Sequence, residues 1–113
     1  MTYDEFQDFI RGKLFLVGLS FYNADRQLLG QYQTSGRVEH LTDTGILVLK
    51  RDDDSLFAVP YDDGAIRPAA PGEYTEHSTG KTIVNPDYLL SGDVEVADAA
   101  EIEAIRERGF FTA

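Results

Sequence analysis

The chain has 113 residues, of which 42% are hydrophobic, and its 20 acidic and 10 basic residues give a net charge of −10. This length and hydrophobic content predict one folded domain over residues 1–113, because a single core can offset the entropy of ordering the chain. The absence of cysteine excludes disulfides, thiolate nucleophiles and zinc–thiolate sites. The acidic charge argues against a nucleic-acid partner, because the phosphates would be repelled.

The N-terminal segment predicts a helix over about residues 3–11. Thr2 and Glu5 have the spacing of a capping box, and Phe6, Phe9 and Ile10 fall on one helical stripe. The segment carries acidic residues where a secretory signal would be basic, and no apolar run approaches the ~20 residues of a membrane span. We therefore expect a cytoplasmic protein with no membrane segment.

Residues 13–59 predict four consecutive strands. The first, over 13–22, alternates so that one face carries Phe15, Val17, Leu19 and Phe21, which we expect in the core. The second runs from about 27 to 41 and can bend at its glycines, and the third and fourth cover 46–50 and 56–59. Turn residues separate them, including the run Asp52 to Ser55.

The remaining segments predict a proline-stiffened loop, a hairpin, one more strand and a helix. The loop covers 65–72, the hairpin 73–84 with its turn near Gly80, and a half-exposed strand 93–97. A helix over about 98–108 begins at Asp98 and ends at Gly109, where Phe110 is placed to contact Ile105. Together the elements predict a mainly β (α+β) fold: a small barrel or a strongly curved antiparallel sheet with a helix at each end.

Three features of the predicted strands resemble the Sm-like and SH3-like small barrels. They are the first strand over 12–21, the step Gly36-Arg37-Val38 in the bent strand, and the tight hairpin at Asp53. The segment 57–88, with its PYDDG, RPAAPGEY, STGK and NPDY pieces, resembles a family of small uncharacterised bacterial proteins. Sm-like barrels often bind RNA, but the bases here are scattered and no aromatic residue lies in a basic run. The resemblance therefore implies an SH3-like or Sm-like barrel, and we do not extend RNA binding to this chain.

The excess acidic charge is concentrated in the second half of the chain. Residues 1–50 contain six acidic and five basic residues, whereas residues 51–113 contain 14 and five. The stretch RDDDSLFAVPYDDG places five aspartates on either side of a short strand, and its spacing does not match a calcium-binding loop. We interpret it as two turns whose tips can also contact a basic partner. The candidate binding residues are Asp52, Asp53, Asp54, Tyr61, Asp62 and Asp63.

These patterns favour a non-enzymatic protein-interaction module with an acidic surface for a basic protein partner. One form of this hypothesis is an immunity or inhibitor protein, because fixed carboxylates can mimic phosphates at a basic active site. No cofactor, metal ligand set or catalytic residue is predicted. One alternative is a weak metal-dependent enzyme that uses His40, His77 and the Asp52 cluster, and a second is a subunit of a homo-oligomer that pairs through a strand edge near Val94.

Overall fold

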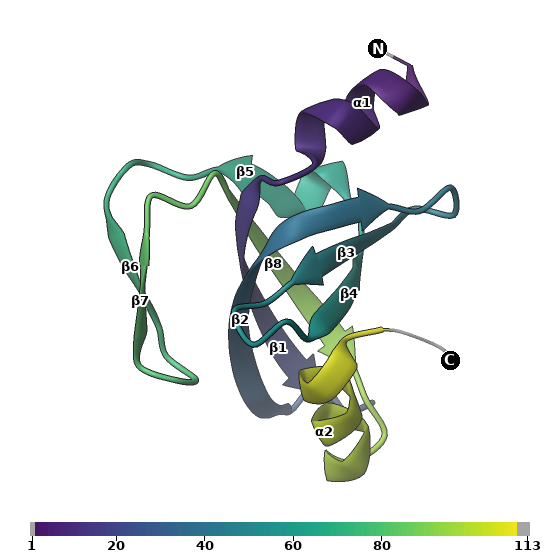
Figure 1. Ribbon diagram of the computed structural model, residues 1–113. Coiled ribbons are helices and arrows are strands. Elements are labelled where there is room, and N and C mark those ends of the chain that lie inside the picture. Colours follow the sequence, from purple (N-terminus) through teal and green to yellow (C-terminus); the bar gives the residue numbers. More distant parts are fainter. Residues whose placement is uncertain (1, 111–113) are drawn as a thin grey trace.

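The protein is mainly β with two helices, and the computed structural model describes residues 2–110 (Figure 1). The helices are α1 (Tyr3–Ile10) and α2 (Ala99–Arg108), and a short 3-10 turn forms η1 (Asp63–Ala65). The strands are β1 (Leu14–Tyr22), β2 (Leu28–Leu41), β3 (Ile46–Lys50), β4 (Leu56–Pro60), β5 (Ile66–Pro68), β6 (Glu73–Glu76), β7 (Lys81–Val84) and β8 (Tyr88–Glu95). No helix within residues 2–110 is long and apolar enough to cross a membrane.

The first half of the chain folds as its local signals predict. The capping box of α1 is present, because the Thr2 hydroxyl accepts the Glu5 N–H and the Glu5 carboxylate accepts the Thr2 N–H. Strands β1 to β4 form an antiparallel meander, and their bounds agree with the predicted strands to within a residue. The fourth strand extends to Pro60, which pairs with Ile46 at the outer edge of the sheet, where a missing N–H breaks no ladder bond.

The second half of the chain departs from the predicted boundaries. The last strand is not confined to 93–97, because β8 begins at Tyr88, directly after the Asn85-Pro86-Asp87 turn. The loop over 65–72 contains part of η1 and the short strand β5. The hairpin over 73–84 and the helix over 98–108 are confirmed as β6–β7 and α2.

The main sheet is mixed, with the strand order β4-β3-β2-β1-β8-β5. The expectation of an antiparallel sheet is wrong at one pair, because β8 runs parallel to β1, from Phe15↔Tyr88 to Tyr22↔Glu95. A parallel pair needs a long crossover, which the chain between β1 and β8 supplies. Within residues 2–110 no ladder joins the two end strands β4 and β5, so the predicted barrel is not confirmed by the strand pairing.

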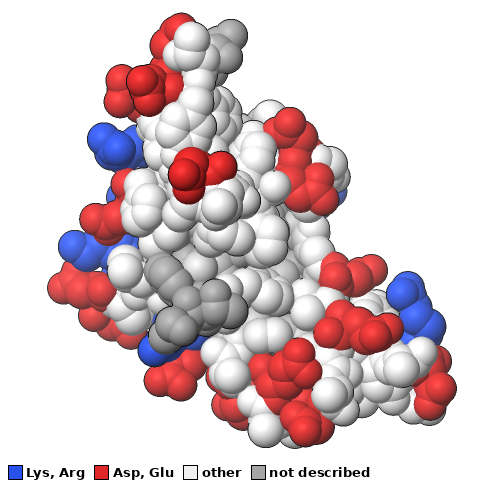
Figure 2. Space-filling view, turned by 90° about the vertical axis from the view of Figure 1, so that its right-hand side faces the viewer, with Lys and Arg blue, Asp and Glu red and all other residues white. Residues whose placement is uncertain are grey.

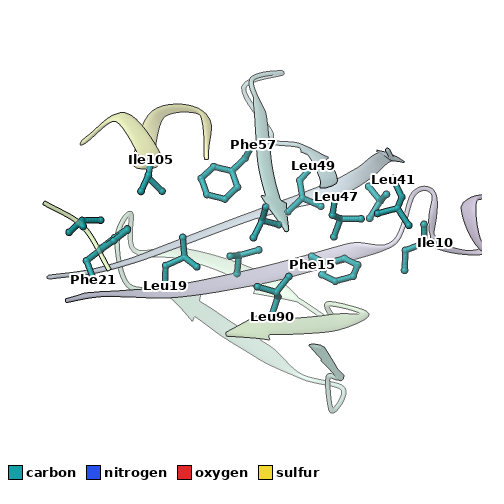
Figure 3. Packing of buried hydrophobic residues seen from close by; sticks show 14 residues of the cluster. Ile10, Phe15, Leu19, Phe21, Leu41, Leu47, Leu49, Phe57, Leu90 and Ile105 are labelled. Atoms are coloured by element: carbon teal, nitrogen blue, oxygen red, sulfur yellow. The ribbon is translucent and has the colours of Figure 1, made fainter. Parts of the chain in front are cut away.

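The curvature of the sheet encloses one hydrophobic core (Figure 3). The predicted face of β1 forms one side of it: Phe15, Val17 and Phe21 are fully buried and Leu19 is 3% exposed. Side chains of β3 and β4 form the other side, including Leu49 and Phe57. Ile105 of α2 and Ile10 at the end of α1 close the two ends of this core.

Helix α2 is attached to the outer edge of β4 through Gly109. Gly109 has a positive φ of 72° with a ψ of −141°, which lies outside the left-handed helical region of a Schellman cap, and its N–H bonds to the Ile105 carbonyl. The next N–H, that of Phe110, bonds to the Ala58 carbonyl of β4 at 2.7 Å. The end of the chain's second helix thereby covers an edge that would otherwise be free to pair.

Candidate functional site

The β6–β7 hairpin lies beside the main sheet and is attached to β2 by polar contacts (Figure 1). The N–H of Gln33 donates to the Ser78 hydroxyl at 2.8 Å, and the Gln33 side-chain oxygen accepts the His77 N–H at 2.7 Å. A cleft of about 520 Å³ opens where the hairpin, β2, the β3–β4 turn and the end of α2 meet. We call it the hairpin cleft. It is lined by Tyr32, Thr34, Ser35, Arg51, Asp52, Asp53, Ser55, Glu76, Thr79, Lys81, Arg106 and Glu107.

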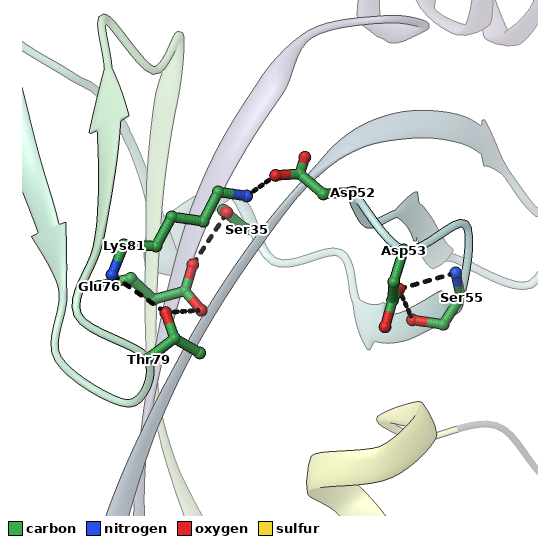
Figure 4. A network of polar contacts seen from close by, with 7 residues as sticks. All are labelled: Ser35, Asp52, Asp53, Ser55, Glu76, Thr79 and Lys81. Atoms are coloured by element: carbon green, nitrogen blue, oxygen red, sulfur yellow. Dashed lines mark hydrogen bonds and ion pairs between the residues drawn. The ribbon is translucent and has the colours of Figure 1, made fainter.

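Glu76 is the one charged residue within residues 2–110 that is buried, with 5% of its surface exposed. Its two carboxylate oxygens accept hydrogen bonds from the Ser35 hydroxyl at 3.0 Å and the Thr79 hydroxyl at 3.2 Å (Figure 4). No basic nitrogen of residues 2–110 lies within 4.0 Å of this carboxylate. A carboxylate withdrawn from water is costly unless a counter-charge accompanies it. The hairpin cleft therefore contains a buried negative charge that hydroxyl groups alone compensate.

The basic side chains of the hairpin cleft already have other partners. The ammonium of Lys81 pairs with Asp52 of the β3–β4 turn (Figure 4). The Arg51 guanidinium donates to the Tyr32 hydroxyl at 3.2 Å and to two carbonyls at the end of α2. Arg106 lies over the Tyr32 ring, 5.1 Å from its centroid. These contacts hold the walls of the cleft together, and none of them involves Glu76.

Asp52, Asp53 and Asp54 lie in the turn between β3 and β4, where the sequence predicted a turn. Asp53 accepts the N–H of Ser55 at 2.9 Å and the Ser55 hydroxyl, and these hydrogen bonds lower the pKa of its carboxyl group. Asp54 has a left-handed φ of 68°, a conformation that aspartate tolerates better than most residues. Asp52 and Asp53 line the hairpin cleft, so the structure places two of the six predicted residues at this site.

The predicted residues Tyr61, Asp62 and Asp63 lie at the opposite end of β4. At about 3.3 Å per residue, the five residues of β4 separate the two acidic turns by about 15 Å. Asp62 caps η1 by accepting the Gly64 N–H at 2.9 Å. The Tyr61 ring meets the edge of the Phe6 ring of α1, with centroids 5.5 Å apart. The two halves of the predicted site are therefore two separate surfaces.

The surroundings of Tyr61 make its ionisation unusual. Burial, followed by the neighbouring Asp63 carboxylate, raises the pKa of Tyr61 to about 12. Between pH 10, the ordinary pKa, and about pH 12, the folded protein therefore keeps a proton that the unfolded chain releases, and stability falls as the pH rises through this range. Spectrophotometric titration should show one of the six tyrosines ionising last. The late step should disappear in Tyr61→Phe, and simultaneous ionisation of all tyrosines would contradict the assignment.

The two histidines do not come together. The backbone N–H of His77 bonds to the side chain of Gln33 in β2. His40 lies seven residues after Gln33 on the same strand, and at about 3.3 Å per residue these positions are about 20 Å apart. Within residues 2–110 no three histidine or acidic side chains are arranged to hold a metal ion. The structure thus separates the residues on which the metal-dependent alternative depended.

The sequence interpretation did not identify Glu76, Ser35 or Thr79 as site residues. Glutamate is rarely buried, so Glu76 was counted only as part of the acidic charge. The predicted hairpin contained a usable signal, because strand alternation places Glu76 and Ile83 on the same face, and both are buried.

Comparison with protein-family models, with curated proteins and with solved structures finds no match to this chain. The resemblance to Sm-like and SH3-like barrels and to small bacterial proteins therefore stays a prediction.

Proposed function

We propose that the protein is a non-enzymatic interaction module that binds a basic protein partner, with the hairpin cleft as the principal contact. The observation that carries this proposal is the burial of Glu76 with hydroxyl partners only. A lysine or arginine side chain of the partner would bring the missing positive charge to this carboxylate. Charge-assisted hydrogen bonds of this kind are roughly twice as strong as neutral ones.

The acidic charge of the whole molecule supports the same partner. It is not confined to the hairpin cleft, because Figure 2, which shows the side of the molecule away from the β6–β7 hairpin, also carries many acidic side chains and few basic ones. The net charge of −10 attracts a basic protein at long range and raises the rate of encounter. Asp62 and Asp63, about 15 Å from the Asp52 turn, contribute to this field and not to the cleft itself.

One form of the proposal is an immunity or inhibitor protein that covers the basic active site of an enzyme such as a nuclease. Fixed carboxylates can take the positions of substrate phosphates in such a site. The proposed architecture is a small barrel of SH3-like or Sm-like kind. It is supported by the meander order β4-β3-β2-β1 and by the irregular β2–β3 register between Val38 and His40.

The proposal can be tested with a short arginine-rich peptide as the probe and with charge-matched variants. Glu76→Gln and Asp43→Asn each remove one negative charge, but Asp43 is exposed in the β2–β3 turn, outside the cleft. We expect Glu76→Gln to weaken binding by about tenfold, because it removes the buried charge, and Asp43→Asn by no more than about twofold. Isothermal titration calorimetry at low and at physiological salt measures both effects.

Two results would contradict this function. Equal weakening by Glu76→Gln and Asp43→Asn would mean that only the net charge matters and that the cleft is not the contact. Binding that does not weaken with added salt would remove the electrostatic basis of the proposal.

A further inference from the structure

More than half of β2 has no partner strand on one of its two edges. Strand β1 pairs with β2 from Leu28 to Arg37, but β3 pairs with it only from Arg37 to Leu41. The edge that faces β3 is therefore open over residues 28–36, and no other strand within residues 2–110 pairs with it. In Figure 1 this open part is the lower half of β2, which lies between the hairpin turn and α2.

The hydrogen-bonding direction of each residue in this segment follows from one contact. The N–H of Gln33 donates to Ser78 of the hairpin turn, so Gln33 faces away from β1. Because antiparallel strands alternate between the two edges, Gln31 also directs its N–H and C=O toward the open edge, whereas Gly30 and Tyr32 bond to β1. The open edge thus offers the backbone N–H and C=O of Gln31, and it ends where Ser78 covers the N–H of Gln33.

The open edge lacks the features that usually prevent strand pairing. Folded proteins protect such edges with charged residues, prolines or covering segments. The outer edge of β4 is covered at Ala58, β5 ends in Pro68, and the unpaired end of β8 carries Asp93 and Glu95. By contrast, the segment LLGQYQ over residues 28–33 contains no charge and no proline, and its two leucines are 53% and 44% exposed.

A cleft of about 690 Å³ borders the open edge at Tyr32, between the hairpin turn and α2. It is lined by Tyr32, Ser78, Thr79, Glu103, Ala104, Arg106 and Glu107. Its arginine already lies over the Tyr32 ring and pairs with Glu103 at 3.4 Å. Four of its residues, Tyr32, Thr79, Arg106 and Glu107, also line the hairpin cleft, so the two clefts are continuous. A strand on β2 would thus extend toward Glu76.

We propose that the open edge of β2 binds an extended basic segment of the partner as an additional β-strand. The inference rests on the proposed function and specifies the form of the partner. Backbone hydrogen bonds to Gln31 supply affinity, and the acidic side chains of α2 and the hairpin cleft select basic residues at alternate positions. A second copy of this chain fits less well, because each copy carries a net charge of −10 and the two molecules would repel each other.

The test uses a short synthetic peptide of alternating Lys and Val, with an alternating Glu and Val peptide for comparison. Hydrogen exchange of the free protein should show fast exchange at Gln31 and slow exchange at Gly30 and Tyr32. Binding of the Lys–Val peptide should slow the exchange of Gln31. The matched variants are Gln31→Pro, which removes the N–H at the edge without removing a ladder bond to β1, and Gln31→Thr, which keeps it. We expect Gln31→Pro to weaken binding by about tenfold and Gln31→Thr by no more than about twofold.

The outcomes separate this inference from the proposed function. If the Lys–Val peptide binds in a salt-dependent way but Gln31 still exchanges fast, the strand assignment is overturned and the acidic interaction module stands. The exchange measurement uses the unaltered protein, so it decides the question even where Gln31→Pro fails to fold. If the Lys–Val peptide does not bind, and Glu76→Gln does not weaken binding of the arginine-rich peptide, both proposals fail. A dimer that becomes monomeric in Gln31→Pro would assign the edge to a second copy and overturn the peptide assignment.

Discussion

Replacing Phe57 with alanine should destabilise the protein by about 3–5 kcal/mol, the range for truncating a buried phenylalanine. Phe57 is fully buried, in the short strand between the two acidic turns. Its ring also supports the hairpin cleft, because the Arg51 guanidinium lies 5.2 Å from its centroid and the Tyr32 ring 6.2 Å from it. Urea unfolding measures the loss, which is a large fraction of the ~5–15 kcal/mol that stabilises an ordinary domain.

Phe57→Leu is the control for this prediction. Leucine keeps most of the apolar volume, so we expect a loss below about 1.5 kcal/mol. The alanine variant should in addition disturb Arg51 and Tyr32, and through them weaken binding of the arginine-rich probe. A loss below about 1.5 kcal/mol in Phe57→Ala would mean that the core closes over the missing ring and that this ring does not organise the cleft.

Local sequence signals were sufficient for the elements of the first half of the chain. The alternation in β1, the turn residues before β3 and β4, and the capping box of α1 each depend on residues close together in sequence. The same holds for the acidic turns, because Asp53 bonds to Ser55 two residues away. These features were predicted because short-range chemistry determines them.

The pairing of distant strands could not be predicted in this way. Tyr88 lies beside Phe15 because the chain returns to β1 only after strands β2 to β5 and the β6–β7 hairpin, and no residue near Tyr88 specifies that neighbour. The open edge of β2 has the same origin, since it follows from β3 being shorter than β2. For this reason only part of the candidate site was predicted from the sequence. Asp52 and Asp53 were identified from their own turn, whereas Glu76 reaches them only through the packing of the hairpin.

The length of β4 explains why the predicted acidic surface divides in two. A strand holds its ends apart, so an acidic turn at each end places Asp52 and Asp62 on different parts of the molecule. The stretch RDDDSLFAVPYDDG predicts two turns whose acidic tips contact a basic partner, because the second half of the chain carries nearly all of the excess acidic charge. In the structure the first turn belongs to the hairpin cleft, and the second contacts α1 through Tyr61.

Replacing Gly109 with alanine should lower the free energy of unfolding by about 3 kcal/mol, although the substitution adds a single methyl group. A Cβ at this position would lie 2.1 Å from the Ala58 carbonyl oxygen and 2.7 Å from the Ala58 nitrogen. Both are backbone atoms of β4 and cannot rotate away, so the end of α2 must move off the edge strand. The hydrogen bond from Phe110 to Ala58 and part of the packing of Ile105 would be lost with it.

Gly45→Ala separates the close contact from backbone strain. Gly45 has a positive φ of 86°, like Gly109, but its Cβ would meet no atom within 4 Å. We therefore expect Gly45→Ala to lower the free energy of unfolding by only about 1 kcal/mol, the cost of the left-handed conformation. Thermal unfolding compares the two variants, and hydrogen exchange at Phe110 reports whether α2 has left β4. Helix α2 places Glu103 and Glu107 beside the open edge of β2, so Gly109→Ala should also weaken binding of the Lys–Val peptide. Equal losses of stability in the two variants would show that α2 is not held at Ala58.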